Sequence, residues 1–174
     1  LGMALLMFGA LAQEHNALSR TFAPMMRVLA EKYQATTHLS VMMGSEIVII
    51  NKFSAGPFVF MSSRVGGTLN AHSTAMGKCI LAFSEPERVQ SYLGEAQLTR
   101  FTEHTITDRA ELAAELERIR RRGYALDDEE THNGLFCIAC PIFDMSHKPI
   151  AAMSISGQKE NMCARQQEVA DFMN

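Results

Sequence analysis

The chain has 174 residues, of which 47% are hydrophobic and 20% are charged. This length and composition are those of one soluble globular domain, with a core large enough to need neither disulfides nor a metal. The net charge of −3 argues against nucleic-acid binding by this chain alone, because phosphate contacts require a surplus of Lys and Arg on one face. The basic run 118–122 lies on a predicted helix among acids, and we interpret it as a solvated face.

The four cysteines indicate reduced thiols and a cytoplasmic protein rather than a disulfide framework or a metal site. Cys137 and Cys140 have C-x-x-C spacing, but they lie inside a strand-like run, whereas redox and zinc motifs of this spacing lie at turns or helix starts. The apolar segment 3–12 is too short to span a bilayer, which takes about 20 residues, and it lacks the basic start of a signal peptide. No cofactor motif is found.

The first part of the chain predicts helices and then antiparallel strands. Apolar residues first recur at helical spacing, after which the period changes to that of β-branched and apolar runs around glycine turns. The expected elements are helices over 3–12 and 18–34, a hairpin of strands 38–43 and 46–51 around Gly44-Ser45, and a strand over 57–65 that ends at Gly66-Gly67.

The second part predicts two capped helices, a hairpin and a final helix. Ser73 or Thr74 can cap a helix that stops before Pro86, and Asp108 with Glu111 forms a capping-box pattern for a helix closed by Gly123. The runs 137–143 and 150–156 are expected strands around the loop 144–149. The order of elements predicts an α+β domain with a mainly antiparallel sheet. Both ends of the chain lie inside helical patterns, so we expect a fragment of a longer protein.

The last two predicted strands define two faces. If they pair regularly, with Phe143 opposite Ile150, then Cys137 lies opposite Ser156 and Ala139 opposite Ser154. These four residues then share a face of small polar groups, while Ile138, Ile142, Met153 and Ile155 share an apolar one. A bulge near Pro141 would break this parity. The polar face is either the wall of a pocket or a solvent-facing surface, and Cys and Ala favour the pocket.

A second candidate feature is the start of the helix near Thr74. Its free backbone amides, on Ala75, Met76 and Gly77, form a seat for a carboxylate, and 66-GGTL-69 upstream allows close backbone approach. The acids 127-DDEE-130 are less specific, because runs of acids are usually solvated. Strand alternation places Asp127 and Glu129 on one face and Asp128 and Glu130 on the other, so the four cannot all serve one site.

An enzymatic alternative uses Cys137 as a nucleophile or redox thiol. It would need a positioned histidine, and His132 lies on the intervening loop with unspecified geometry. The chain has no HExxH, Gly-x-Ser-x-Gly, phosphate-loop or dinucleotide-binding motif. Its six histidines are scattered, so a metal site would have to be assembled by the fold.

The sequence resembles the effector-binding domain of the IclR family of bacterial transcription regulators, and the similarity covers nearly the whole chain. Several spaced motifs in the right order make it specific. The residues that carry it are Gly123, Asp127, Glu130, Cys137, Ile138, Ala139, Ile142, Phe143 and Asp144, with the runs 69-LNAHSTAMGKCILAF-83, 101-FTEHTITDRAEL-112 and 149-PIAAMSISG-157.

This resemblance implies a GAF- or PAS-like fold, in which helices flank a curved, mainly antiparallel sheet with a small-molecule pocket. It also implies a non-enzymatic repressor that senses a small organic acid such as a keto acid and acts as a homodimer or homotetramer. Operator DNA would bind through an N-terminal winged helix-turn-helix domain outside this chain. Residues 1–17 would be the end of an inter-domain linker helix, and 18–174 the effector-binding and oligomerisation domain.

The resemblance further implies which residues contact the effector. The amides of Ala75 and Met76 would bind its carboxylate. Met76 and Phe58 are large for such a pocket and would reshape it. The remaining contacts would be the polar groups of Asp127, Cys137, Ser154 and Ser156 and the apolar wall of Phe58, Met61 and Leu69.

Overall fold

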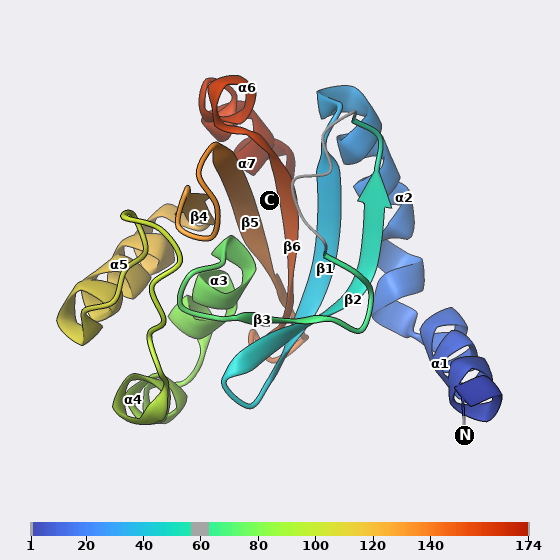
Figure 1. The fold of residues 1–174 in the computed structure, drawn as a ribbon, viewed down its shortest axis with the longest axis horizontal. Helices are drawn as coiled ribbons and strands as arrows, with labels where there is room; N and C mark the ends of the chain where they lie inside the picture. The colour runs from blue at the N-terminus through green and yellow to red at the C-terminus, as the bar shows by residue number, and fades with distance from the viewer. Residues whose placement is uncertain (1, 57–62, 174) are drawn as a thin grey trace.

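The computed structural model describes residues 2–56 and 63–173 as one α+β domain (Figure 1). Its helices and strands confirm the predicted class. Within those ranges the elements are α1 Gly2–His15, α2 Ala17–Tyr33, β1 Thr36–Met43, β2 Glu46–Ser54, β3 Thr68–Asn70, α3 Ala75–Phe83, α4 Pro86–Glu95, α5 Arg109–Arg122, β4 Ala125–Asp128, β5 Leu135–Phe143, β6 Pro149–Gln158, α6 Lys159–Cys163 and α7 Gln166–Met173.

The strands form one curved sheet in the order β3-β2-β1-β6-β5-β4, and the paired neighbours run antiparallel. Figure 1 shows α3, α4 and α5 on one side of this sheet and α2, α6 and α7 on the other. Because β1 pairs with β6, the N-terminal and C-terminal hairpins are joined at the centre of the sheet. The two hairpins thus form one continuous sheet, and helices cover both of its faces.

Each face has its own apolar core. On the α3 side, Cys79, Leu116, Ala139 and Ala152 belong to one buried cluster. On the α2 side, Leu29, Ile138, Met153 and Ile155 belong to the other, with Val169 of α7. Alternate residues of β5 and β6 enter alternate clusters, as the period of two in a strand requires. The predicted division of these strands into two faces is confirmed.

Local signals fix the helix ends. Thr74 caps α3 by accepting a hydrogen bond from the amide of Gly77 at 3.1 Å. Asp108 caps α5 through the amide of Glu111 at 2.8 Å, and Gly123 ends it at a φ of +87°. Arg118, Arg120 and Arg122 of that helix are at least partly exposed and pair with Glu115 or Glu117, in agreement with the predicted solvated face. These caps place α3 and α5 where the sequence predicts them.

Two expectations about strands differ from the structure, and two elements were not predicted. Residues 57–62 of the strand predicted over 57–65 lie outside the described residues, and Ser63–Val65 are not a strand. Phe143 pairs with Pro149 and not with Ile150, because a bulge between Ile142 and Phe143 absorbs one residue. The bulge lies beyond Ala139 and Cys137, so their predicted pairing with Ser154 and Ser156 is confirmed. The short strand β3 and the helix α4 have no counterpart among the predicted elements.

The acidic run also departs from simple alternation. The strand β4 ends at Asp128, and Glu129 takes a left-handed backbone conformation with a φ of +61°. This turn brings Glu130 back to the side of Asp127, whose Oδ1 accepts a hydrogen bond from the Glu130 amide at 2.8 Å. The prediction that Asp127 and Glu130 lie on opposite faces is therefore wrong.

Candidate functional site

The start of α3 lies over the polar face of the sheet. The Thr74 hydroxyl donates to the carbonyl of Asn70 at 3.0 Å while it caps the helix, so the first turn is held from both sides. The amide of Gly77 is used by this cap and is not free, contrary to expectation. Within the described chain, the amides of Ala75 and Met76 have no hydrogen-bond partner. Two helix N-terminal donors thus remain for an anion.

Gly77 allows α3 to lie this close to the sheet. A Cβ atom on Gly77 would lie 2.3 Å from the Cα and 2.4 Å from the carbonyl oxygen of Ala71. Both are backbone atoms that cannot rotate away, so no larger residue fits. Glycine at this position therefore fixes the height of the Ala75 and Met76 amides above the strands.

The floor beneath the helix is a row of polar side chains that crosses the sheet. Thr36 of β1 pairs with Ser156 of β6, Ser156 with Cys137 of β5, and Cys137 with Asp127 of β4. Two residues further along β1, on the same face, His38 pairs with Ser154. All point to the α3 side by strand alternation.

Asp127 is buried, with 1% of its surface exposed, and its carboxylate is bonded to its own loop. Besides the Glu130 amide, it accepts hydrogen bonds from the amide of Thr131 at 3.2 Å and from its hydroxyl at 2.6 Å. Burial raises the pKa of Asp127, and the bonds from Thr131 and the charge of Lys78 oppose that rise. Asp127 therefore shapes the loop as well as the edge of the site.

Cys137 donates its thiol hydrogen to Oδ2 of Asp127 at 3.8 Å. Burial raises its pKa well above the usual range, and the negative charge of Asp127 raises it further. A buried thiol held in its protonated form is not an activated nucleophile. An activated thiol nucleophile requires a depressed pKa, whereas burial and the charge of Asp127 raise the pKa of Cys137.

A buried ion pair connects α3 to the loop that follows β4. Lys78 of α3 bonds the carboxylate of Glu130, with side chains 1% and 8% exposed. Burial raises the pKa of Glu130 to about 7, against the opposing charge of Lys78. Thr105 donates to the Glu130 carbonyl at 2.6 Å, and the neighbouring Glu129 pairs with Lys159. The acids after β4 are thus structural, and they fasten α3 to the loop that carries Asp127.

These groups enclose a cavity of about 20 Å³. Seven of the nine predicted contact residues line it: Leu69, Ala75, Met76, Asp127, Cys137, Ser154 and Ser156. The other two, Phe58 and Met61, lie outside the described residues. His38 and Thr74 also line the cavity and were not among the predicted contacts. The signal for His38 is its register with Ser154, which depends on strand pairing across the middle of the sheet.

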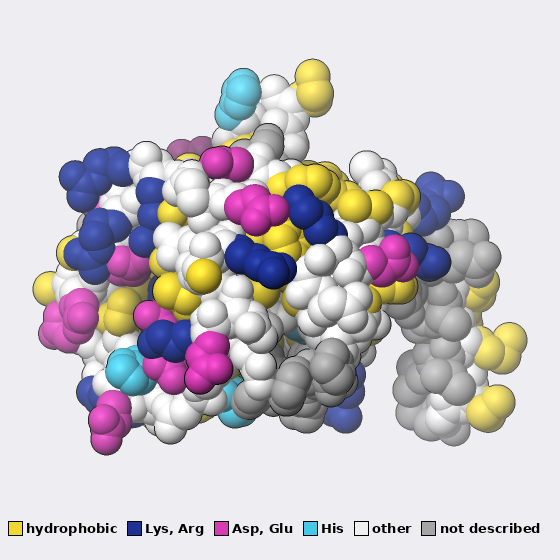
Figure 2. All heavy atoms as spheres, turned by 90° about the horizontal axis from the view of Figure 1, so that it is seen from above, with side chains coloured by type: hydrophobic (Ala, Val, Ile, Leu, Met, Phe, Trp, Pro, Cys, Tyr) yellow, Lys and Arg dark blue, Asp and Glu magenta, His cyan; other side chains and the backbone are white. Residues whose placement is uncertain are grey.

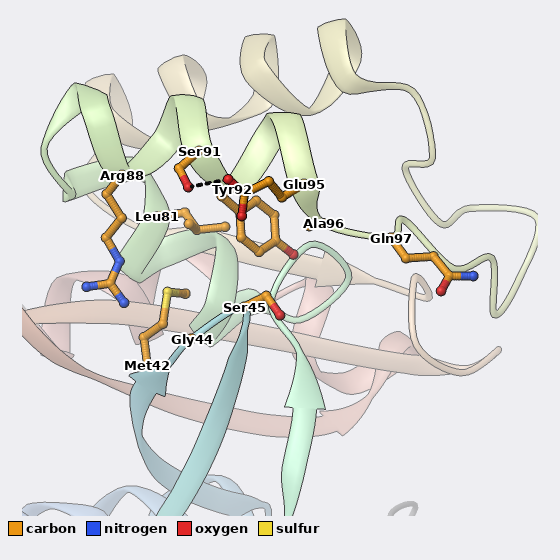
Figure 3. Close-up of a pocket in the computed structure, with 10 residues that line it drawn as sticks. All are labelled: Met42, Gly44, Ser45, Leu81, Arg88, Ser91, Tyr92, Glu95, Ala96 and Gln97. Carbon is orange, nitrogen blue, oxygen red and sulfur yellow. Dashed lines mark hydrogen bonds between the residues drawn. The ribbon is translucent and has the colours of Figure 1, made fainter.

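A larger groove lies elsewhere, between α4 and the β1–β2 turn. It has a volume of about 550 Å³ and is lined by Met42, Ser45, Arg88 and Tyr92 among others. Figure 3 shows Arg88 and Tyr92 reaching from the helix toward Met42 and Ser45, with Ser91 bonded to Glu95. None of the seven predicted contact residues that the structure describes lines this groove, so the fold separates it from the cavity under α3.

Two further findings concern the described residues only. They contain no cluster of three or more His, Cys, Asp or Glu side chains able to hold a metal ion. None of the helices among them is long and apolar enough to cross a membrane.

Fold and site together define an α+β domain in which a helix-covered antiparallel sheet carries a small polar cavity under α3. Residues 10–173 match the model of the family described as "Bacterial transcriptional regulator IclR C-terminal". The chain therefore belongs to the IclR family of transcriptional regulators and is an effector-binding domain of that family.

Individual curated relatives agree with this family assignment. The chain is 38% identical over 156 residues to the transcriptional regulator KdgR of Dickeya chrysanthemi, covering 90% of this chain and 51% of that protein. It is 34% identical over 159 residues to the transcriptional repressor IclR of Escherichia coli, covering 90% and 58%. It thus spans about half the length of the curated relatives that it matches. These relatives are named as regulators and not as enzymes.

Solved structures share the fold. The Thermotoga maritima IclR structure superposes with a TM-score of 0.93 at 34% identity, covering 99% of this chain and 70% of that one. An IclR homologue from Microbacterium hydrocarbonoxydans complexed with 4-hydroxybenzoate gives 0.84 at 26% identity, covering 99% and 73%. The expected curved antiparallel sheet flanked by helices is confirmed.

Proposed function

We propose that this domain senses a small carboxylic acid, such as a keto acid, bound in the cavity under α3. The observation that carries the proposal is the pair of unpartnered amides of Ala75 and Met76 above a polar floor. The positive end of the helix and its N–H groups favour a carboxylate at this point. Ser154, Ser156 and the Cys137 thiol supply hydrogen bonds for a keto or hydroxyl oxygen next to it.

The cavity is small, so the effector must be small and the side chains around the cavity must move when it binds. A volume of about 20 Å³ holds about one water-sized probe, so an acid of five or six heavy atoms enters only if side chains move. Met76 and Leu69 form the apolar part of the lining, and an unbranched methionine side chain repacks at low cost. Binding and rearrangement of this wall are therefore one event.

For the whole protein, we propose a cytoplasmic repressor in which effector binding changes DNA affinity. Residues 1–17 would be the end of a linker helix to an N-terminal winged helix-turn-helix domain, and 18–174 would sense and oligomerise as a dimer or tetramer. In support, α1 extends away from the body of the domain (Figure 1). Its Met3, Met7 and Phe8 are 73%, 62% and 68% exposed, and yellow side chains of this helix face solvent in Figure 2.

Calorimetric titration of the chain with small acids tests the sensing role. We expect a monocarboxylic keto acid to bind and the Ser154→Ala, Ser156→Ala double variant to lose about tenfold or more in affinity, since each lost hydrogen bond costs about 1 kcal/mol. Ser91→Ala on exposed α4 is the matched control and should bind as the unaltered chain does. If no acid in the panel binds the unaltered chain, or if the double variant binds with full affinity, the assignment of this cavity is wrong.

A further inference from the structure

His38 is a buried histidine on the floor of the cavity, with 2% of its surface exposed. One ring nitrogen, Nε2, lies 2.9 Å from the hydroxyl of Ser63. The other, Nδ1, is buried and has no hydrogen-bond partner in the described chain. A buried polar atom left unpaired costs about 1–3 kcal/mol, so a ligand that pairs it recovers that free energy.

We propose that His38 determines effector specificity, by hydrogen-bonding through Nδ1 to an uncharged keto or hydroxyl oxygen of the bound acid. This inference rests on the proposed function, because it assigns a further contact in the same cavity. It adds a selection rule: monocarboxylic acids with a keto or hydroxyl group bind, and acids without that oxygen, or with a second carboxylate in its place, are rejected.

The imidazole can serve either oxygen. If the Ser63 hydroxyl donates to Nε2, then Nδ1 carries the proton and donates to a keto oxygen. If Nε2 donates to Ser63, then Nδ1 accepts from a hydroxyl. The ring position is the same in both cases, because the Ser63 contact persists and only the proton changes place. The site therefore accepts a keto acid and its hydroxy analogue.

The surroundings keep His38 neutral. Burial, aided by the nearby positive charge of Lys52, lowers the pKa of His38 to about 4. The Lys52 ammonium itself donates to the carbonyl of Ser63 at 2.7 Å. At neutral pH the histidine is thus a dipole and not a counter-ion.

The described residues that line the cavity include the acid Asp127 and no lysine or arginine to pair with a second carboxylate. Lys78 is already paired with Glu130, and Lys52, whose charge reaches His38, is not among the lining residues and bonds the Ser63 carbonyl. Burying an unpaired charge beside another carboxylate is strongly unfavourable. Dicarboxylic acids are therefore excluded by charge, and unsubstituted acids are disfavoured by leaving Nδ1 unpaired.

Two substitutions separate the two ring nitrogens. Asparagine can place a polar group near the position of Nδ1, whereas glutamine reaches the position of Nε2. We would titrate the chain, His38→Asn and His38→Gln with pyruvate, lactate, propionate and malonate. The unaltered chain should bind pyruvate and lactate about tenfold more tightly than propionate, and malonate least, since a hydrogen bond of this kind contributes about 1–1.5 kcal/mol. His38→Asn should keep this preference. His38→Gln should reduce it by about tenfold, and any preference that remains comes from Ser154, Ser156 and Cys137.

A preference for pyruvate and lactate as large in His38→Gln as in the unaltered chain would overturn the role of His38 but leave the sensing function standing. Absence of binding by all four acids to the unaltered chain would overturn both. If the variants fail to fold, nitrogen NMR of the unaltered chain tests the contact between Nδ1 and the acid. The Nδ1 resonance of His38 should then shift on pyruvate binding while the ring stays neutral. An unchanged Nδ1 resonance in the pyruvate complex would refute the contact.

Discussion

Lys78 on α3 and Glu130 after β4 form an ion pair in the interior of the domain, with side chains 1% and 8% exposed. The pair joins the helix whose first turn carries the unpartnered amides to the loop that bonds Asp127. Taking two charges out of water is expensive, and removing one partner leaves the other buried and uncompensated. The pair is thus more important for the position of the site than for net stability.

Lys78→Met is expected to lower the free energy of unfolding by about 3–5 kcal/mol, because Glu130 then stays buried beside Asp127 without a cation. The double variant Lys78→Met, Glu130→Leu should recover most of that loss. Urea unfolding measures both. Lys148→Met removes an exposed ion pair with Glu85 and should change stability by less than about 1 kcal/mol. Equal losses in the single and double variants would show that packing, and not charge, accounts for the effect.

Gly77→Ala should destabilise the domain by about 1–3 kcal/mol and weaken acid binding, because the added methyl group meets the Ala71 backbone and displaces the start of α3. Gly94→Ala is the matched control. A Cβ there meets nothing within 4 Å, and alanine favours helix by about 1 kcal/mol over glycine, so stability should stay the same or rise. Thermal unfolding and acid titration of both variants check this. The close-approach argument fails if Gly77→Ala unfolds and binds as the unaltered chain does.

His38 should contribute a pH-dependent part of the stability. Its pKa is about 4 in the folded domain and about 6.5 when unfolded, so the unfolded state binds the extra proton between these values. The contribution is fully present above pH 6.5 and is lost as the pH falls to about 4. Over that range it amounts to about 3 kcal/mol, at about 1.4 kcal/mol per pH unit.

Comparison with His38→Gln isolates this contribution, because Asp127, Glu130 and His72 titrate in both proteins. Between pH 7 and pH 4 the unaltered chain should lose about 3 kcal/mol more than the variant, as measured by urea unfolding at each pH. If the free energies of unfolding of the two proteins change in parallel with pH, His38 is not buried in its neutral form.

Thiol reactivity should be confined to one cysteine. Burial raises the pKa of Cys79 and Cys137 well above the usual range and that of Cys140 to about 12, whereas Cys163 is exposed. A disulfide reagent should label one thiol quickly in the folded chain and four in denaturant, and Cys163→Ser should remove the fast phase. A fast phase that persists in Cys163→Ser and disappears in Cys137→Ala would revive a reactive role for Cys137.

The parts of the fold that were predictable depend on short-range signals. The cap at Thr74, the Asp108 to Gly123 helix and the Gly44 hairpin each follow from residues within a few positions of one another. The two faces of β5 and β6 follow from alternation alone. The resemblance to a family then placed seven residues that the fold does bring around one cavity.

The parts that were missed depend on long-range or irregular geometry. His38 enters the cavity only through the pairing of β1 with β6, which no local pattern specifies. Glu130 turns back to Asp127 because Glu129 takes a left-handed conformation, which is uncommon for glutamate and could not be read from alternation. The bulge after Ile142, which pairs Phe143 with Pro149, is likewise an irregularity that strand alternation does not predict.

The strand β6 belongs to two interiors at once. Ser154 and Ser156 face the cavity, while Met153 and Ile155, between and beside them, pack with Met26 and Leu29 of α2. Neighbours on one extended backbone cannot shift independently, and densely packed cores transmit such shifts. A bound acid that increases the distance between α3 and the two serines would therefore also shift Met153 and Ile155 toward α2, the helix that follows α1. Under the proposed function, the sheet would therefore couple the cavity to the helices at the N-terminal end of the chain.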